Sequence, residues 1–330
     1  MRRKIFCLLL SAVLVLSVGC AAKPAAQEDD GRLRVVCSLF PYYDFVRAIG
    51  GEYVDAQLLV PAGRETHSFE PTPLDVIKVS RADVLIYNGG HGEYWVSEIL
   101  GSAGEKIPTV VCMMDHTEAL EEEIVEGMEV HEHHHHHHED DHDHETEDDG
   151  HHEEIEYDEH IWTSPVGSKE LCRTIYEALC AADPAHKDAY AANLAAYLEE
   201  LDALDEAFRQ VVAEGQRNLL VFGDRFPLLY FCKTYGLDYR AAFHGCAGDT
   251  EPSLETLKYL IDKVNSEQIP VVYTIELSSQ KIADAIAEST GARVETLHSC
   301  QTISRQEFDD GETYLSLMWR NVDALKEGLS

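Results

Sequence analysis

Residues 33–60 decide the fold, and they read LRVVCSLFPYYDFVRAIGGEYVDAQLLV. The run at 33–39 is short and mostly apolar, which is typical of a strand buried on both faces of a parallel sheet. Residues 41–50 have helical periodicity, begin on a proline and end at a Gly-Gly pair. Strand character returns at 54–60. This order predicts a strand, a crossover helix and a second parallel strand, the unit from which α/β folds are built.

The same alternation continues on both sides of one long helical pattern at 184–215, which would span roughly 45 Å. The other predicted helices are 72–81, 94–100, 168–181, 227–235, 253–266, 279–290 and 314–329. The other predicted strands are 84–87, 109–112, 219–222, 271–275 and 293–297. We therefore predict an α/β protein with two lobes, each with a mostly parallel sheet flanked by helices. The lobes would occupy 33–183 and 216–330, joined by the long helix at 184–215.

The chain begins with features of a secretion signal. Three basic residues precede an apolar run at 5–18, which is too short to span a bilayer comfortably and is followed by a glycine and Cys20. The position of Cys20 resembles a bacterial lipoprotein processing site, although Ser17 stands where leucine is usual. We predict a signal peptide at 1–19 and a lipidated Cys20 at the start of a flexible tether, 20–32, which anchors an extracytoplasmic protein to the bacterial cell membrane. Simple secretion and an uncleaved anchor are the alternatives.

Residues 121–159 interrupt the α/β pattern. They contain nineteen acidic residues, eleven histidines and no Lys or Arg. With almost nothing apolar to bury, this segment is expected to be a mobile loop inserted in the first lobe. Purification tags also carry six consecutive histidines, but tags lie at termini and this run is internal. The imidazoles predict auxiliary metal binding by His131, His133, His134, His135, His136, His137, His138, His142, His144, His151 and His152.

Charge and cysteine content exclude several kinds of partner and site. The formal net charge is −35, and removal of 1–19, with its three basic and no acidic residues, would make it −38. Nucleic acid and anionic lipid are poor partners for such a surface. Seven cysteines follow Cys20, so at least one thiol is unpaired or ligating, and no CxxC spacing indicates a cysteine zinc site.

Two histidine motifs carry the most specific information. VPAGRETHSFEPTP at 60–73 places His67 after a predicted strand, and DEHIWTSP at 158–165 places His160 just before a predicted helix. Side chains on such turns can converge between two lobes, and a neutral imidazole is a good zinc ligand. The pair of motifs therefore indicates a metal site.

These two motifs resemble the zinc and manganese solute-binding lipoproteins of bacterial ABC importers. The same resemblance extends to three further segments, YYDFV at 42–46, ADVLIYNG at 82–89 and YLSLM at 314–318. It runs from about residue 33 to the end of the chain. The acidic histidine loop resembles the insertion that is typical of the family's zinc-specific members.

The resemblance implies a metal site in the cleft between the lobes, with His67 and His160 as ligands from the first lobe. The family takes its third ligand, usually His or Glu, from the second lobe, three residues before an aromatic residue. If Phe226 is that aromatic residue, Gly223 falls at the ligand position and has no side chain to offer. Asp224, one position later, becomes the candidate for this ligand.

The family's fourth ligand, when present, is an Asp that follows the last predicted strand. His298 or Cys300 aligns there, and His298 is preferred because imidazole is mostly neutral at pH 7 whereas an ordinary thiol is mostly protonated. Cys300 can instead pair with Cys246 in an oxidising compartment, a disulfide that the sequence alone leaves open. His244 and Glu276 are the reserve candidates for a ligand of the second lobe.

The implied function is capture of Zn²⁺ and its delivery to the permease subunit of an ABC importer by a monomeric solute-binding protein. Manganese or ferrous iron is the alternative cargo, although these ions favour more oxygen ligands than this histidine-rich set provides. An enzyme is not expected, because a zinc hydrolase needs an open coordination position and a general base, and the sequence has no HExxH motif. A zinc-dependent adhesin or a passive metal buffer is a third possibility.

Replacement of the predicted lipidation site tests the anchor. Cys20→Ala should move the mature protein from the membrane fraction to the soluble fraction, because one lipid-bearing site governs membrane attachment. Fractionation followed by immunoblotting measures this, with Cys37→Ala as the control. Signal cleavage without release from the membrane would refute the predicted anchor.

Overall fold

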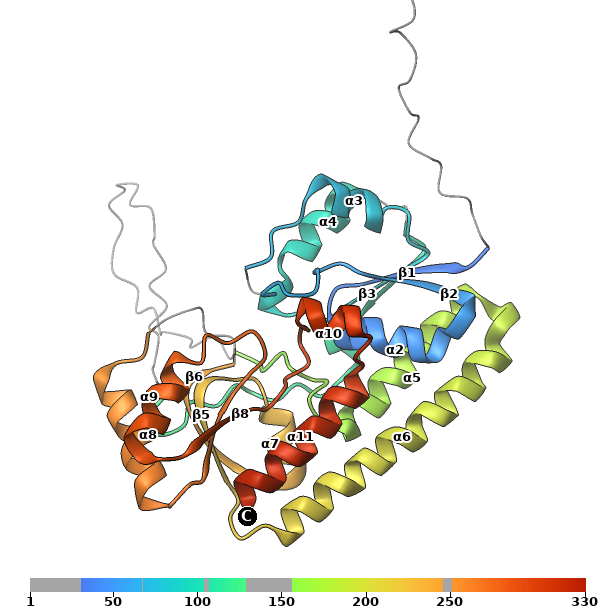
Figure 1. Ribbon diagram of the computed structural model, residues 1–330. Coiled ribbons are helices and arrows are strands. Elements are labelled where there is room, and N and C mark those ends of the chain that lie inside the picture. Colours follow the sequence, from blue (N-terminus) through green and yellow to red (C-terminus); the bar gives the residue numbers. More distant parts are fainter. Residues whose placement is uncertain (1–30, 67, 104–106, 129–155, 246–250) are drawn as a thin grey trace, which may run out of the picture. The chain divides into compact units, whose positions relative to one another are not determined.

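Two parallel β-sheets, one in each half of the chain, form the framework of the protein (Figure 1). The structure is a computed structural model that describes residues 31–66, 68–103, 107–128, 156–245 and 251–330. Within it, Leu33–Ser330 forms one compact unit. The two sheets with their helices confirm the predicted α/β class.

The first sheet has the strand order β2-β1-β3-β4, and all its strands are paired in parallel. Its strands are β1 (Leu33–Cys37), β2 (Val54–Leu58), β3 (Val84–Tyr87) and β4 (Thr109–Cys112). Alternate residues of the central strand β1 enter different cores. Val35 belongs to the same apolar cluster as Phe45, whereas Val36 belongs to the cluster that contains Trp95. Both faces of β1 are therefore covered, as its apolar sequence predicts.

Three helices connect the strands of this sheet along the chain, and local signals set their ends. They are α2 (Phe40–Gly50), α3 (Pro73–Val79) and α4 (Trp95–Ala103). Gly51 ends α2 with a φ of 55°, a conformation that glycine adopts without a Cβ clash. α3 begins with a capping box between Thr72 and Asp75. The short 3₁₀ turns η1 (Gly51–Tyr53), η2 (His91–Glu93) and η3 (Met113–His116) complete the lobe.

The second sheet has the order β6-β5-β7-β8 and is also parallel. Its strands are β5 (Leu219–Phe226), β6 (Asp238–His244), β7 (Val271–Thr274) and β8 (Arg293–Thr296). Its helices include α7 (Leu229–Tyr235), α8 (Leu254–Ser266) and α9 (Lys281–Thr290).

The sequence did not predict β6, and it predicted β5 four residues too short. β6 lies at the edge of the sheet and carries Arg240, so it lacks a continuous apolar run.

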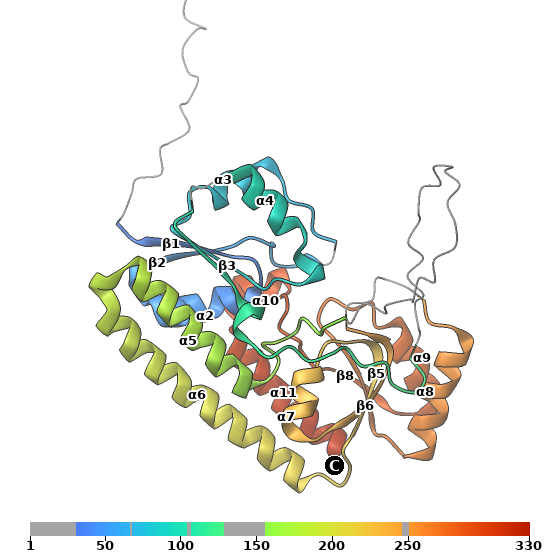
Figure 2. The same ribbon diagram turned by 180° about the vertical axis from the view of Figure 1, so that it is seen from behind.

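A set of long helices connects the lobes. These are α5 (Pro165–Ala182), α6 (Lys187–Glu214) and α11 (Tyr314–Leu329). The 3₁₀ turn η4 (Pro184–His186) precedes α6, and the short helix α10 (Arg305–Asp310) precedes α11. The sequence did not predict α10. At 28 residues α6 is about 42 Å long. It packs against α5, α2 and α11 (Figures 1 and 2).

The predicted apolar stripe of α6 is buried, as expected for its helical spacing. Its members are Tyr190, Leu194, Tyr197, Leu201, Leu204 and Phe208. They belong to one continuous apolar cluster that also contains Phe45 of α2, Phe231 of α7 and Tyr314 of α11. The packing of α6 therefore links the two lobes. Within the described ranges, no helix combines the length and apolar character that crossing a bilayer requires.

The buried carboxylate of Asp44 should make stability depend on pH. Asp44 is 4 % exposed, and its Oδ2 accepts a hydrogen bond from the N–H of Tyr314 at 2.8 Å. Burial raises the pKa of Asp44 to about 6. The folded protein then binds more protons than the unfolded chain between about pH 4 and 6, so the free energy of unfolding falls as pH rises through that window.

Asp44→Asn keeps an acceptor for Tyr314 and removes the titration. Relative to wild type, this variant should gain about 2 kcal/mol of stability between pH 4 and pH 7. Urea unfolding at both pH values measures the gain, and the exposed Asp262 provides an Asp→Asn control. An identical pH dependence in wild type and Asp44→Asn would contradict the assignment.

Candidate metal centre

His160 lies in a buried turn just before α5, with 0 % of its surface exposed. The backbone N–H of His160 donates to Asp158 Oδ1 at 2.8 Å, and Nδ1 of its ring lies 3.2 Å from the same oxygen. The ring also makes an edge-to-face contact with Trp162, with the centroids 5.6 Å apart. These contacts fix the orientation of the imidazole.

The environment of His160 favours its protonated form. Burial by itself would lower the pKa of His160, but the charge and hydrogen bond of Asp158, with contributions from Glu159 and Glu122, raise that pKa above its ordinary value. A cation at this position would be stabilised by the same carboxylates. A metal ion must therefore compete with a proton for this ring.

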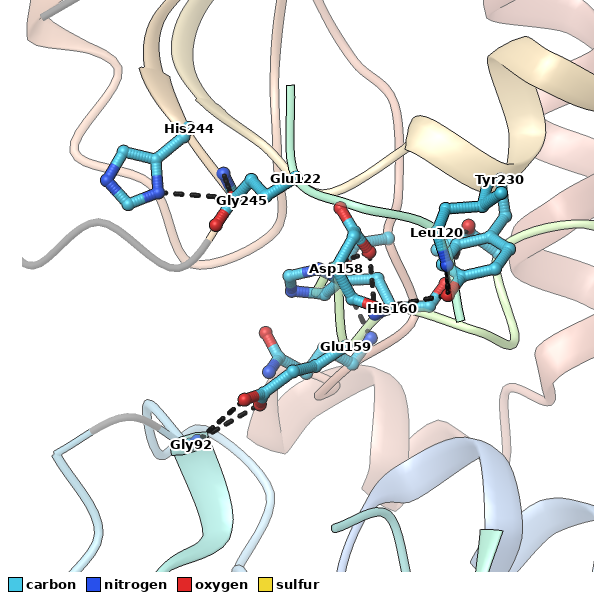
Figure 3. A network of polar contacts seen from close by, with 12 residues as sticks. Gly92, Leu120, Glu122, Asp158, Glu159, His160, Tyr230, His244 and Gly245 are labelled. Carbon is cyan, nitrogen blue, oxygen red and sulfur yellow. Dashed lines mark hydrogen bonds and ion pairs between the residues drawn. The ribbon is translucent and has the colours of Figure 1, made fainter. Parts of the chain in front are cut away.

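The carbonyl end of β6 lies against His160. A Cβ atom on Gly245 would be 3.0 Å from Cε1 of His160 and 3.0 Å from the carbonyl oxygen of Phe226. Glu122 Oε1 lies 3.1 Å from Nδ1 of His244 and accepts the N–H of Gly245 at 2.9 Å. The hydrogen bond to Glu122 raises the pKa of His244, while burial opposes this shift. Figure 3 shows the pairs Glu122–His244 and Asp158–His160 in one network.

The two ends of the acidic loop meet beside this network. Glu121 and Tyr157 form an antiparallel bridge, in which the N–H of Asp158 donates to the carbonyl oxygen of Leu120 at 2.9 Å. Tyr230 of α7 accepts the N–H of Leu120 at 3.0 Å and donates to the carbonyl oxygen of Asp158 at 3.0 Å. The loop between these ends therefore starts and finishes next to His160. Its eleven predicted auxiliary histidines lie outside the described residues.

Glu159 connects the same turn to the first lobe. Its carboxylate accepts the N–H groups of His91 and of Gly92, the latter at 3.0 Å, and its carbonyl oxygen accepts from Asn88 Nδ2 at 2.9 Å (Figure 3). The neighbouring Glu93 accepts the N–H of Asn88 at 2.7 Å, and burial raises the pKa of Glu93 to about 7. The sequence carries no signal for these supporting carboxylates, because their partners are backbone N–H groups.

The structure also describes Asp224, a predicted ligand, in full. Asp224 Oδ1 accepts the N–H of Arg225 at 2.8 Å, and Oδ2 accepts the N–H of Ile275 at 3.5 Å. Its neighbour Gly223 packs against α9, where a Cβ would be only 2.5 Å from Cα of Ala283. Close packing of a helix on β5 is thus the physical reason for glycine at the position where the resemblance implies a ligand.

His298, the other predicted ligand of the second lobe, lies at the end of β8. Its N–H donates to Asn321 Oδ1 at 2.7 Å, and among the described residues its buried Nδ1 has no hydrogen-bond partner. The ring lines a cavity of about 440 Å³ together with Glu276 and Glu307. The nearby Cys300 is a buried free thiol.

Several predictions fall on residues that the structure does not describe, namely Cys20, His67 and Cys246. In the described ranges, no group of three or more His, Cys, Asp or Glu side chains converges as a metal site would require. Assembly of His67, His160, His298 and Asp224 around one ion therefore remains a prediction. Of the reserve candidates, His244 precedes Gly245, which lies against the ring of His160.

Comparison with known proteins identifies relatives that bind zinc. Residues 35–328 match the family described as ZnuA, zinc-uptake complex component A, periplasmic. The high-affinity zinc uptake system protein ZnuA of Bacillus subtilis is 31 % identical over 323 residues, which cover 97 % of this chain and 96 % of that protein. The zinc-binding lipoprotein AdcA of Streptococcus pneumoniae is 31 % identical over 326 residues, which cover 98 % of this chain but only 61 % of AdcA.

A solved structure agrees with this relationship. The Zn(II)-bound ZnuA-like domain of Streptococcus pneumoniae AdcA superposes with a TM-score of 0.71 at 27 % identity, covering 91 % of this chain and 99 % of that domain. The fold and the matched length are therefore shared with proteins that hold zinc. This chain belongs to the ZnuA family of zinc-uptake components.

Proposed function

We propose that this protein captures Zn²⁺ outside the cytoplasm and delivers it to the permease of an ABC importer. The observation that carries the proposal is the buried imidazole of His160, whose Nδ1 pairs with the carboxylate of Asp158. When Nδ1–H donates to the carboxylate, Nε2 carries the lone pair that a metal ion accepts. Family membership and the zinc-binding names of the relatives support zinc as the cargo.

The proposed ligands are His67 and His160 from the first lobe and His298 and Asp224 from the second. His298 offers a ring nitrogen in a cavity lined by carboxylates, and Asp224 already accepts two backbone N–H groups at the carbonyl end of β5. His244 is retained as the alternative, because it precedes Gly245, which lies against the ring of His160. Three nitrogens and one oxygen suit tetrahedral zinc better than manganese, which favours oxygen.

The set also supports binding rather than catalysis. Four protein ligands leave no coordination position for a reactive water molecule, so the protein is proposed not to be an enzyme. Its net charge of −35 favours the encounter with a cation. Anchoring through Cys20 would hold the protein beside its permease, and the histidine loop would collect ions next to the turn that carries His160.

Substitution of single ligands tests the site. His67→Ala and His160→Ala should each weaken zinc binding at least ten-fold, about 1.4 kcal/mol, because each removes a ligand. Calorimetry should use a background without 129–155, so that auxiliary histidines do not mask the loss while Glu122 stays in place. His186→Ala provides a control, since His186 pairs with Asp183 and stacks on Tyr53.

The same measurement separates the candidates of the second lobe. His298→Ala and Asp224→Asn should each lower the affinity as His160→Ala does. An unchanged dissociation constant in either variant would remove that residue from the site. A loss confined to His244→Ala would assign the second-lobe ligand to His244 instead.

Proton competition provides a further prediction. Because the pKa of His160 is raised above its ordinary value, zinc affinity should begin to fall at a pH above that value as the solution is acidified. Asp158→Asn should lower the pKa of His160 in an NMR titration and move the loss of affinity to lower pH. It should also weaken binding at high pH by about 10- to 100-fold. Asp183→Asn is the control, and an unaltered pKa of His160 in Asp158→Asn would refute this role for Asp158.

A further inference from the structure

An ion pair joins the two lobes next to the segment that carries His67. Arg225 Nη2 donates to Glu65 Oε2 at 2.9 Å, and the two side chains are 11 % and 28 % exposed. Glu65 lies between β2 and α3 of the first lobe, whereas Arg225 lies in β5 of the second. A charge-assisted hydrogen bond with this degree of burial is stronger than a pair on an open surface.

The strand β5 is irregular just before Arg225, which affects where its side chain points. The register between β5 and β6 shifts between Phe222 and Arg225. Such a bulge changes the direction in which the following side chains point. Asp224 folds back onto backbone N–H groups, while the guanidinium of Arg225 reaches the first lobe.

Two further hydrogen bonds hold the same segment of the first lobe. The N–H of Gly63 donates to the carbonyl oxygen of Ile303 at 2.7 Å. The hydroxyl of Thr302 donates to the carbonyl oxygen of Arg64 at 3.1 Å. Residues 63–65 therefore contact the segment after β8 at two positions and β5 at a third, and none of these contacts uses a proposed metal ligand.

The ion pair is close in sequence to His67 and close in space to the surroundings of His160. His67 follows Glu65 by two residues. On the other side, Phe226 follows Arg225, and its carbonyl oxygen and Cε1 of His160 both approach Gly245. Separation of residues 63–65 from β5 would therefore remove a contact between the lobes that lies next to Gly245 and His160.

We propose that Glu65 and Arg225 form an interlobe latch that sets the rate at which captured zinc leaves the protein. The inference rests on the proposed function for the identity of the cargo. Arg225 is a positioning residue in this account, because it acts on the segment of His67 and not on the ion. Breaking the pair removes one charge-assisted hydrogen bond between residues 63–65 and β5, which favours their separation. Affinity changes within one site appear mainly in the dissociation rate, so this rate is the informative quantity.

A double-mutant cycle on zinc release tests the latch in the full mature chain. Zinc-loaded protein is mixed with excess chelator, and the slow phase is followed by stopped-flow fluorescence. Glu65→Gln and Arg225→Gln should each accelerate the slow phase about ten-fold. The double variant should be no faster than either single variant, because both remove the same interaction. Lys258→Gln, which breaks an exposed pair with Asp262 inside α8, should leave the rate unchanged.

The opposite results would overturn the proposal. Additive accelerations in the double variant, or unchanged rates in both single variants, would show that the two residues do not act together. If Arg225→Gln does not fold, as judged by circular dichroism, unchanged release in Glu65→Gln alone overturns the latch.

Small-angle scattering of zinc-free protein gives a second readout that does not depend on the cargo. Each single variant should have a larger radius of gyration than wild type, and the exchanged pair Glu65→Arg with Arg225→Glu should return toward the wild-type value. Equal radii in wild type and both single variants would overturn the latch. A wild-type protein that retains no zinc would instead refute the proposed function. The scattering comparison would still show whether the Glu65–Arg225 pair holds the lobes together.

Discussion

The proposed metal centre depends on one buried turn whose consecutive residues are bound to different lobes. The carbonyl oxygen of Asp158 accepts from Tyr230 in the second lobe, whereas Glu159 binds N–H groups of η2 in the first. Trp162 Nε1 donates to the carbonyl oxygen of Ser299, in the second lobe, at 2.8 Å. His160 lies between these attachments. Its position therefore depends on how both lobes are held.

The long helices stabilise that arrangement. The carbonyl oxygen of Trp162 accepts from Ser168 of α5 and from Tyr314 of α11, each at 2.8 Å. α5 and α11 in turn pack on the buried stripe of α6. Apolar packing thus places the backbone of the turn, and carboxylates then orient the ring of His160. A fully buried imidazole with negatively charged neighbours results.

Much of the fold could be predicted because its signals are local. Buried strands such as 33–37 and the apolar stripe of α6 have characteristic periods. β6 was missed because an edge strand with Arg240 lacks a continuous apolar run. Missing β6 also concealed that His244 ends a strand beside His160. For the site, the motif around His160 included Asp158, but Glu122 and Tyr230 are distant in sequence. In the sequence, Gly223 could be recognised only as the absence of an expected ligand. The structure explains the glycine, because a Cβ at this position would clash with Ala283 of α9.

The central claim is that the four proposed ligands, His67, His160, Asp224 and His298, form one site that prefers zinc. Metal analysis of the mature protein, purified without chelating resin and then equilibrated with equal concentrations of Zn²⁺, Mn²⁺ and Fe²⁺, tests it most directly. After exhaustive dialysis against a weak chelator, the account predicts one retained zinc ion per chain, with or without residues 129–155. Retention of manganese or iron in place of zinc, or loss of all bound metal once these residues are removed, would contradict it.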